Sequence, residues 1–308
     1  MKALTIPAYG GPDVLTVADL PDPVAVEGHV LVRVRAAALQ IADVALREGH
    51  LAEVMPDPSL PMTVGWEFAG AVVAVGPAAG RFAVGDPVVG LSRHFATSVG
   101  AQAELIALPE TSLAPAPGSV DTVAAATLPG ALTAVQALDL LGVDDGTSLL
   151  VTGGVGTVGG YALQLARLRG ATVIASTSPA DDALARALGA TSTVDRDRDL
   201  RAQVHELLPG GVDALLDTAV VGDPALDAVR DDGRAVAVLL PAPAPRRGIT
   251  PEVVFTEPDG ARLGELVDLV DTGRLTLRVA ATYALTQAAD AHRRLAQGGL
   301  RGRLVFTL

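Results

Sequence analysis

The stretch Leu149-Leu-Val-Thr-Gly-Gly-Val-Gly-Thr-Val-Gly159, followed by Gly160-Tyr-Ala-Leu-Gln-Leu-Ala-Arg-Leu168, decides the fold of this chain. An apolar strand over 148–152 enters a Gly154-x-Gly156-x-x-Gly159 loop, and an amphipathic helix leaves it. The first glycine permits a tight turn, the second lets backbone approach a pyrophosphate, and the third lets the helix pack on the strand. N–H groups at the helix start then face the anion. The pattern predicts a dinucleotide site, with a purely structural turn as the alternative.

The segments around this loop alternate between strand and helix, which predicts a doubly wound parallel sheet. The expected strands are 148–152, 171–177, 191–195, 212–218 and 234–240. The expected helices are 120–128, 131–141, 160–169, 181–188, 200–208 and 224–230.

The chain on either side of this region has a different pattern. From Met1 to about Pro117, short alternating segments broken by Gly and Pro predict an irregular β domain. Pro241-Ala-Pro-Ala-Pro245 is semi-rigid and is expected to close the strand–helix domain. The expected tail consists of helix 260–271, strand 277–283, helix 288–297 and strand 302–308.

Length and charge narrow the class of protein. A chain of 308 residues is expected to form about two domains. Its net charge of −12 argues against a nucleic-acid partner. We expect no apolar run long enough to cross a bilayer and no signal peptide after Met1, so the predicted location is cytoplasmic.

The reactive side chains available are few. The chain contains no cysteine, which excludes disulfides, thiol nucleophiles and thiolate metal sites. Lys2 is its only lysine, which argues against a Schiff-base mechanism. The histidines show no metal-ligand spacing and are expected to lie mostly at the surface: His29, His50, His94, His205 and His292.

Several motifs, in order along the chain, are similar to those of one known family. The chain resembles the zinc-free quinone oxidoreductases of the medium-chain dehydrogenase/reductase superfamily, the zeta-crystallin-like branch, over essentially its whole length. The matching segments are Tyr9-Gly-Gly-Pro-Asp-Val-Leu15, Ala36-Ala-Ala-Leu-Gln-Ile-Ala-Asp43, Gly65-Trp-Glu-Phe-Ala-Gly70, Ala126-Thr-Leu-Pro-Gly-Ala-Leu-Thr-Ala134, Pro258-Asp-Gly-Ala-Arg-Leu263, Ala291-His-Arg-Arg-Leu295 and Arg301-Gly-Arg-Leu-Val305.

The resemblance implies an α/β architecture with two domains. Residues 1–118 and 250–308 would form a GroES-like, β-rich catalytic domain, and residues 119–249 a Rossmann NADP-binding domain with a doubly wound parallel sheet. The active site would lie in the cleft between them. Relatives often form homodimers by joining nucleotide-domain sheets edge to edge, and the strand 234–240 is apolar enough to do so.

The resemblance also implies a site without zinc. The places that carry Cys, His and Cys ligands in zinc-dependent relatives hold Gln40, Trp66 and the Gly130/Ala131 region here. An amide and an indole without a thiolate cannot hold Zn²⁺. Hydride transfer to a conjugated double bond does not require a metal, because the enone spreads negative charge onto its carbonyl oxygen.

The candidate catalytic residues are Gln40, Tyr9 and Trp66. Gln40 would place a polar donor near the substrate oxygen, or else satisfy backbone as a structural amide. Trp66 would stack on a flat substrate or anchor the core, and Tyr9 is a possible general acid. Gln102 stands where the family commonly has Tyr, and Asp43 and Glu67 occupy positions that are structural as often as catalytic.

The cofactor is expected to be NADPH rather than NADH. An NAD site usually places an acid at the end of the second strand, whereas this strand ends with Ser176, Thr177 and Ser178. Arg196 is the candidate partner of a 2′-phosphate, or one charge of a solvated run. Thr133 would contact the nicotinamide carboxamide, or be a plain helix residue. The remaining expected cofactor contacts are Gly153, Gly154, Gly156, Thr157, Val158, Gly159, Leu239 and Phe255.

These features predict an NADPH-dependent oxidoreductase that transfers hydride to a small apolar or aromatic quinone or another activated alkene. One alternative is a specialised enoyl or enone reductase of a biosynthetic pathway. Another is a protein that binds NADPH without turnover, as a redox sensor or a crystallin-like structural protein.

Overall fold

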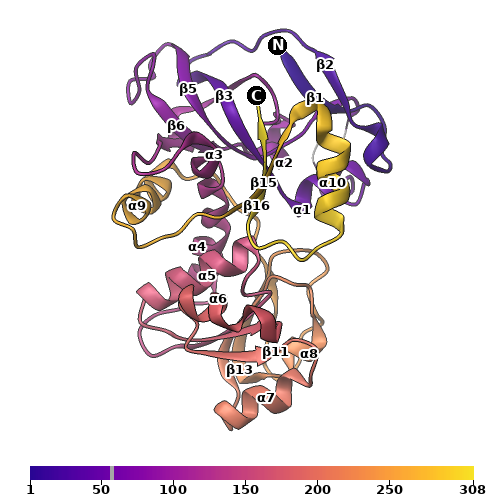
Figure 1. Ribbon diagram of the computed structural model, residues 1–308, viewed down its shortest axis with the longest axis vertical. Coiled ribbons are helices and arrows are strands. Elements are labelled where there is room, and N and C mark those ends of the chain that lie inside the picture. The colour runs from indigo at the N-terminus through magenta and orange to yellow at the C-terminus, as the bar shows by residue number, and fades with distance from the viewer. Residues whose placement is uncertain (56–58) are drawn as a thin grey trace. The chain divides into compact units, whose positions relative to one another are not determined.

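The structure, a computed structural model, describes residues 1–55 and 59–308 (Figure 1). The chain forms two compact units. The first consists of Met1–Gly130 and Glu257–Leu308, and the second of Ala131–Thr256. The first unit is therefore built from both ends of the described chain, with the second unit inserted between them.

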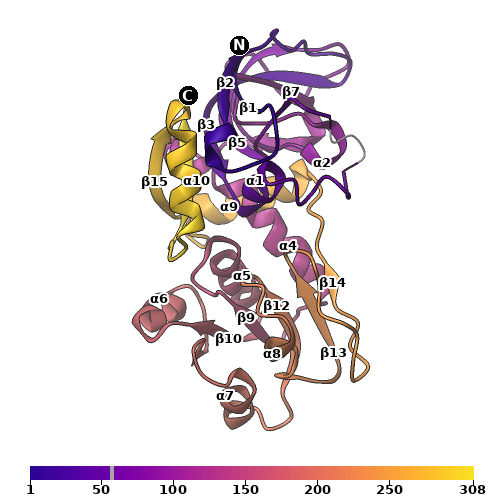
Figure 2. The same ribbon diagram turned by 90° about the vertical axis from the view of Figure 1, so that its right-hand side faces the viewer.

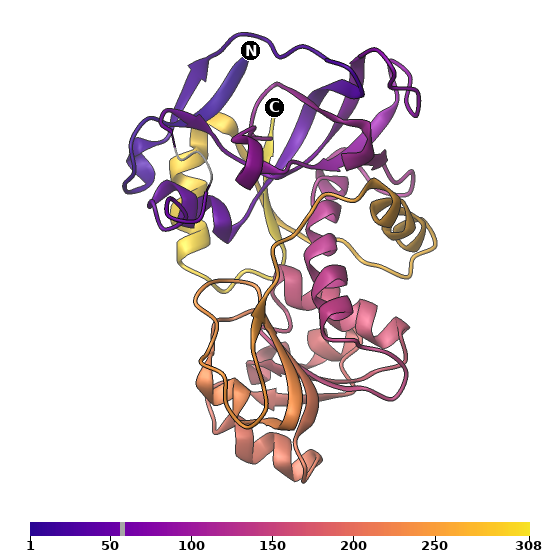
Figure 3. The same cartoon turned by 180° about the vertical axis from the view of Figure 1, so that it is seen from behind.

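The second unit contains a six-stranded sheet in which all neighbouring strands run parallel (Figures 1 and 3). Its strands are β9 (Ser148–Thr152), β10 (Thr172–Thr177), β11 (Ser192–Asp195), β12 (Val212–Asp217), β13 (Val229–Ala237) and β14 (Glu252–Val253). Their order is β11-β10-β9-β12-β13-β14, which is the order of a Rossmann fold. In this order the chain reverses direction across the sheet beside β9, where dinucleotide sites form.

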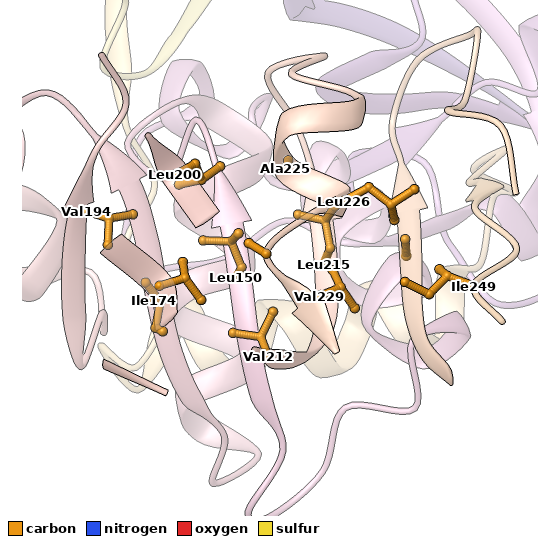
Figure 4. Close-up of a cluster of buried hydrophobic side chains, with 13 residues drawn as sticks. Leu150, Ile174, Val194, Leu200, Val212, Leu215, Ala225, Leu226, Val229 and Ile249 are labelled. Atoms are coloured by element: carbon orange, nitrogen blue, oxygen red, sulfur yellow. The ribbon is translucent and has the colours of Figure 1, made fainter. Parts of the chain in front are cut away.

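Helices cover both faces of this sheet. They are α4 (Ala131–Leu140), α5 (Thr157–Leu168), α6 (Asp182–Ala187), α7 (Leu200–Leu207) and α8 (Asp223–Leu226). On one face, Leu150, Ile174 and Leu215 form a buried cluster with residues of α7 and α8 (Figure 4). Ala175 follows Ile174 and so points to the opposite face, where it lies near Leu163 of α5. The predicted doubly wound sheet is confirmed.

The predicted helix 224–230 and strand 234–240 differ from the structure. The helix α8 ends at Leu226, and β13 already begins at Val229. Val229 pairs with Val212 and is fully buried in the cluster of Figure 4. Val229 is therefore a strand residue and not part of the helix. The strand β13 is also not the edge of the sheet, because β14 pairs with it. The strand predicted to form a dimer contact is therefore covered by β14 at Val236 and Ala237, and the edge-to-edge dimer stays a prediction.

The first unit contains two sheets. A three-stranded sheet has the order β2-β1-β4, and a seven-stranded sheet has the order β15-β16-β3-β5-β6-β8, with β7 also paired to β3. The strands are β1 (Lys2–Ile6), β2 (Thr16–Asp19), β3 (His29–Leu39), β4 (Met62–Thr63), β5 (Glu67–Val75), β6 (Pro87–Leu91), β7 (Leu105–Pro109), β8 (Leu113–Pro115), β15 (Val279–Ala284) and β16 (Arg303–Thr307). The strand β3 is central, since it pairs with β5, β7 and β16.

Short helices complete the first unit. They are α1 (Ile41–Arg47), α2 (His94–Thr97), α3 (Thr122–Ala125), α9 (Gly260–Asp271) and α10 (Ala288–Ala296). The helix α10, yellow in Figures 1 and 2, lies beside the chain of the N-terminal segment, where Arg293 forms an ion pair with Asp13. The helix α9 packs against β8. The C-terminal segment thus packs on the N-terminal part of the chain, and Leu308 packs against the buried cluster that includes Val30, Phe68 and Ile106.

The units divide later in the chain than the predicted boundaries of 1–118 and 119–249. At the first division, α3 packs against β3 and β5, so the chain up to Gly130 belongs to the first unit. At the second, β14 adds to the parallel sheet, so the chain up to Thr256 belongs to the second. The Pro-rich segment 241–245 lies within the second unit and does not close it.

One helical segment is a candidate membrane span by length and hydropathy, although no such segment was expected from the sequence. Thr122–Leu140 is long and apolar enough to cross a membrane by length and composition alone. Of its most apolar window, 67% is buried inside the structure, as in a core helix. Burial against protein accounts for its apolar composition without a bilayer.

Candidate functional site

The glycine loop after β9 is held by backbone contacts that exclude side chains. Gly153 has φ of +59°, so the left-handed turn is at Gly153 and not at Gly154. A Cβ on Gly154 would lie 2.8 Å from the Cβ of Ala175, and a Cβ on Gly159 would lie 2.3 Å from the carbonyl oxygen of Gly153. The third glycine of the motif therefore lets α5 start directly against the loop.

The start of α5 offers a binding site for an anion. The N-cap is Gly156, which has no side chain that could cap the helix, and the helix continues for 12 residues from Thr157. Backbone N–H groups at such an end, with the helix dipole behind them, bind phosphate groups. This donor chemistry fits a dinucleotide pyrophosphate.

A buried carboxylate fixes the neighbouring loop after β12. Asp217 is only 3% exposed. Its Oδ1 accepts hydrogen bonds from Thr152 Oγ1 at 2.6 Å, from the N–H of Ala219 at 3.3 Å and from the N–H of Val221 at 3.1 Å. Its Oδ2 accepts from the N–H of Gly222 at 2.8 Å. The sequence analysis missed this anchor, whose signal is a polar residue at the end of each of two apolar strands.

A cavity of about 310 Å³ lies at the carboxyl ends of β10 and β11. Its lining is polar and partly acidic: Thr177, Ser178, Pro179, Asp182, Thr193, Val194 and Asp195. Asp182 accepts hydrogen bonds from Thr193 and from Arg186, and these bonds hold the pKa of its carboxyl below the usual range. Two carboxylates thus share this cavity with the predicted hydroxyl groups.

The residues expected to distinguish the two cofactors occupy different environments. Ser176 and Thr177 are buried, and the Thr177 hydroxyl has no hydrogen-bond partner among the described residues. Ser178 donates to Asp181 at 2.7 Å. The side chain of Arg196 is 61% exposed, and its Nε lies 3.8 Å from Asp197. Arg196 is therefore held only weakly and has room to move toward a ligand.

The other expected cofactor contacts lie at element ends of the second unit. Thr133, on α4, accepts a hydrogen bond at 2.9 Å from the hydroxyl of Thr256. Leu239 follows the carboxyl end of β13, and Phe255, which is 53% exposed, follows that of β14. Because the carboxyl ends of parallel strands meet at one edge of a sheet, both residues lie at the same edge as the glycine loop.

In the first unit, Gln40 lies at the start of α1. It is the N-cap residue of this helix, and its side chain is partly exposed. Both interpretations of Gln40, a donor to the substrate and an amide that satisfies backbone, therefore stay predictions.

Directly behind Gln40 lies a cluster of buried charged groups. The backbone N–H of Gln40 donates to Asp43 Oδ2 at 2.8 Å. Nearby, Arg303 Nη2 donates to Glu67 Oε1 at 2.6 Å. Asp43, Glu67 and Arg303 are 0%, 1% and 7% exposed. A Cβ on Gly130 would lie 2.4 Å from Arg303 Nη2, so only glycine leaves room for the guanidinium there.

Trp66 and Gln102 belong to the interior of the first unit. Trp66 is 8% exposed and packs against the rings of His94, at 4.6 Å between centroids, and Phe95. Gln102 is fully buried and donates to the carbonyl of Ala38 at 3.2 Å. These contacts favour the core-anchor interpretation of Trp66 and give Gln102 a structural position.

Tyr9 is not brought together with Gln40. Tyr9 is 36% exposed and its ring faces Gly49, just beyond the C-terminal end of α1. Gln40 lies at the opposite end of this seven-residue helix, about 10 Å away by helix rise. Tyr9 therefore lies near the opposite end of α1 from Gln40, and its part in the reaction stays a prediction.

Two of the five histidines, His94 and His292, are buried, whereas the other three are exposed or half-buried, in line with the expectation of mostly surface positions. His94 donates from Nε2 to the carbonyl of Thr63 at 2.7 Å, and burial lowers its pKa. His292, on α10, accepts at Nδ1 from Arg47 Nη1 at 3.0 Å. Burial, followed by the neighbouring Arg47 charge, lowers the pKa of His292 to about 3. Both rings are therefore neutral parts of the core.

The described part of the chain offers no cluster of metal ligands. Within residues 1–55 and 59–308, no group of three or more His, Asp or Glu side chains is arranged to hold one. An amide, a buried indole and a glycine stand at the three positions that the sequence analysis compared with zinc ligands, Gln40, Trp66 and Gly130. None of these groups is a zinc ligand.

Comparison with protein families places known domains on both units. Residues 26–118 match the alcohol dehydrogenase GroES-like domain, and residues 188–306 match a zinc-binding dehydrogenase family. The chain is 31% identical to a quinone oxidoreductase of Pseudomonas aeruginosa, over 99% of both chains. It is also 31% identical to the 2-methylene-furan-3-one reductase of Solanum lycopersicum, over 99% of this chain and 79% of that protein.

A solved structure shows the same fold. The quinone oxidoreductase from Coxiella burnetii superposes with a TM-score of 0.88, at 29% identity, over 100% of this chain and 99% of that one. The α/β architecture, with a GroES-like domain and a Rossmann-type parallel sheet, is confirmed by these comparisons.

Proposed function

Because the chain belongs to the quinone oxidoreductase-type branch of the medium-chain dehydrogenase/reductase superfamily and is an oxidoreductase, we propose that it transfers hydride from NADPH to a quinone or another activated alkene, without zinc. The glycine loop carries this proposal, because its close backbone packing brings the start of α5, with its N–H donors, directly behind β9, where a pyrophosphate would bind. The bound nicotinamide cofactor supplies the hydride.

The protein's own residues would bind and orient the reactants. Backbone N–H groups from Thr157 to Gly159 would hold the pyrophosphate, and the hydroxyls of Ser176 and Ser178 would face the adenosine ribose. The Gln40 amide would donate to the carbonyl oxygen of the substrate, where negative charge develops during hydride transfer. This donor would replace the polarising role that a metal has in zinc-dependent enzymes.

The choice of NADPH rests on a balance of charges. The hydroxyls at the end of β10 and the loosely held Arg196 favour a 2′-phosphate. The carboxylates of Asp182 and Asp195 in the same cavity oppose it. We therefore propose that NADPH is preferred by a modest factor and that NADH also binds.

The function is tested by mixing the purified protein with NADPH and either a 1,4-quinone or an alkenal, while the absorbance of the reduced nicotinamide is followed. We expect oxidation with at least one of these acceptors. Nicotinamide fluorescence that changes on binding, with no oxidation by any acceptor, would instead identify a non-catalytic NADPH-binding protein.

The role of Gln40 is tested in the same assay. Gln40→Leu keeps the size of the side chain and removes the donor, so kcat/KM is expected to fall about a hundredfold. The matched control is Gln297→Leu, which removes an exposed amide at the end of α10 and is expected to leave kcat/KM unchanged. An equal loss in both variants would contradict a specific role for Gln40.

An enone reductase of a biosynthetic pathway is a second candidate. It is favoured by the likeness to the 2-methylene-furan-3-one reductase, a protein named for an activated alkene. Oxidation of NADPH with alkenals but not with quinones would select this function.

For either enzyme we propose a homodimer in the cytoplasm, with no nucleic-acid or membrane partner. Light scattering of the purified protein tests the dimer.

A further inference from the structure

Three buried charged side chains lie behind Gln40, and each has one atom without a hydrogen-bond partner. These atoms are Asp43 Oδ1, Glu67 Oε2 and Arg303 Nε. The other oxygen of Asp43 holds the Gln40 backbone at 2.8 Å, and the other oxygen of Glu67 holds Arg303 at 2.6 Å. Buried polar atoms are seldom left without a partner, so this arrangement requires an explanation.

The charges of the cluster do not balance. Two carboxylates face one guanidinium, which leaves one negative charge in the interior if both acids are ionised. The charged groups that act on Asp43 are Glu67, from β5, and Arg303, from β16. On its own helix, the Arg47 guanidinium is engaged by Glu48 and His292. No further cation among the described residues compensates the second carboxylate, and an uncompensated buried charge takes up a proton instead.

We propose that Asp43 and Glu67 hold one proton between them at neutral pH, so that a neutral Asp43–Glu67–Arg303 cluster anchors the first turn of α1 and positions the Gln40 amide. The proton is the donor that Asp43 Oδ1 and Glu67 Oε2 otherwise lack. Asp43 is a positioning residue in this scheme, since its contact with Gln40 is to the backbone. The consequence for catalysis rests on the proposed function of Gln40, whereas retention of the proton does not.

The electrostatics of the cluster agree with this proposal. Burial, together with the Glu67 charge, raises the pKa of Asp43 to about 8, while the backbone N–H groups of Gln40 and Gly65 and the Arg303 charge oppose the rise. Burial also raises the pKa of Glu67, against the effect of Arg303. Loss of the proton in alkaline solution leaves both carboxylates charged with one guanidinium between them to compensate, and the excess negative charge destabilises the first turn of α1.

The proton is tested by unfolding the full chain in urea between pH 6.5 and pH 9. Trp66 is the only tryptophan of the chain and neighbours Glu67, so its fluorescence reports on the first unit. The folded state retains a proton that the unfolded state releases near pH 4, so stability decreases as the pH rises toward 8. The folding constant is expected to fall up to tenfold per pH unit and to level off above pH 8.

In Asp43→Asn the side chain is neutral at every pH. The decrease of the folding constant between pH 6.5 and pH 8 should therefore be absent in this variant. The matched control is Asp121→Asn, which alters an exposed aspartate that also accepts a backbone N–H at a helix start, at 2.8 Å from the Ala124 nitrogen. The control should keep the wild-type pH dependence. A wild-type dependence that persists unchanged in Asp43→Asn would overturn the proposal.

Positioning is tested by the kinetics of Asp43→Ala and Asp43→Asn. We expect Asp43→Ala to lower kcat/KM for the quinone at least tenfold and Asp43→Asn to recover most of the loss. The recovered activity should lack the alkaline decline of the wild type. Activity in Asp43→Asn as low as in Asp43→Ala would contradict a positioning role. Failure of the proposed function would instead appear as no oxidation in the wild type, with the pH effect on unfolding intact.

Discussion

The two units bury aspartates in opposite ways. In the second unit, both oxygens of Asp217 accept hydrogen bonds, from one hydroxyl and three backbone N–H groups. In the first unit, Asp43 and Glu67 are equally buried, yet each leaves one oxygen without a partner. One aspartate is satisfied by backbone, whereas the other lies beside a second acid.

This difference distinguishes a carboxylate that fixes the backbone from one whose protonation can change. A carboxylate surrounded by N–H groups is stabilised as an anion and fixes a loop in one conformation. A carboxylate in a cluster with an unpaired oxygen is sensitive to protonation, and its neighbours move with its charge. The stability of the second unit is thus expected to change little with pH over the range in which the stability of the first unit changes.

The largest expected effect is that of Asp217→Ala. It leaves three N–H groups and one hydroxyl without their acceptor, which should cost about 3 kcal/mol of the unfolding free energy. Urea unfolding followed by far-UV circular dichroism measures the loss. Asp197→Ala removes a carboxylate that is 75% exposed and should cost under about 0.5 kcal/mol. Similar losses in the two variants would remove the distinction drawn for Asp217.

A glycine substitution tests whether the loop itself, and not only its anchor, is fixed. In Gly159→Ala the new Cβ meets the Gly153 carbonyl, so the backbone must move and NADPH affinity should fall roughly tenfold to a hundredfold. Titration of nicotinamide fluorescence measures the affinity. Gly210→Ala is the matched control, because no atom lies within 4 Å of its new Cβ. Unchanged affinity in Gly159→Ala would show that the loop adapts.

A pH experiment on His292 extends the comparison within the first unit. The folded pKa of His292 is about 3 and the unfolded value is 6.5, so its contribution to stability is complete above pH 6.5 and is lost as the pH falls below it. The loss is about 1.4 kcal/mol per pH unit. Urea unfolding followed by Trp66 fluorescence at pH 7.5 and pH 5.5 measures it as the difference between the wild type and His292→Gln, because the raised pKa of Asp43 acts in the opposite direction over this range in both proteins. Acidification should therefore destabilise the wild type relative to His292→Gln, and the same pH dependence in both proteins would assign the effect to other groups.

The smallest effects are expected from exposed charges near the cavity of the second unit. Arg196→Ala should weaken NADPH binding about fivefold while NADH binding changes less than about twofold. Asp182→Asn should act in the opposite direction and favour NADPH. Fluorescence titrations with both cofactors measure the ratio, with Glu206→Gln as an exposed control outside the cavity. Equal loss of both cofactors in Arg196→Ala would refute its assignment to the 2′-phosphate.

Local patterns could be predicted from the sequence because their causes are local. The glycine loop lies between a strand and a helix that the apolar spacing already predicts, and the parallel sheet follows from alternating segments. The boundary between α8 and β13 could not be predicted in this way. Val229 becomes a strand residue because it pairs with Val212, and helical spacing alone does not reveal that partner.

The buried groups depend on partners far along the chain. Arg303 pairs with Glu67 across 236 residues, and Arg47 meets His292 across 245 residues. No local pattern encodes these contacts, so Asp43 and Glu67 were assigned no definite role, and the two buried histidines could not be told apart from the three exposed or half-buried ones. Trp66 shows the same limit, since an indole beside Glu67 is compatible with a substrate wall or with a core until its neighbours are known.

The pairing of β16 with β3 sets an order for folding during synthesis. Every residue of the second unit is translated before β16, whose strand lies against the far half of β3 and carries Arg303. Until then, the edge of β3 between Ala36 and Leu39 has no partner strand, and exposed edges of this kind invite pairing with other chains. The second unit is therefore able to complete its sheet first, while the first unit depends on β16 for closure. A ribosome stalled before Arg303 would hold a chain with a complete nucleotide sheet, an open β3 edge and no guanidinium for Glu67.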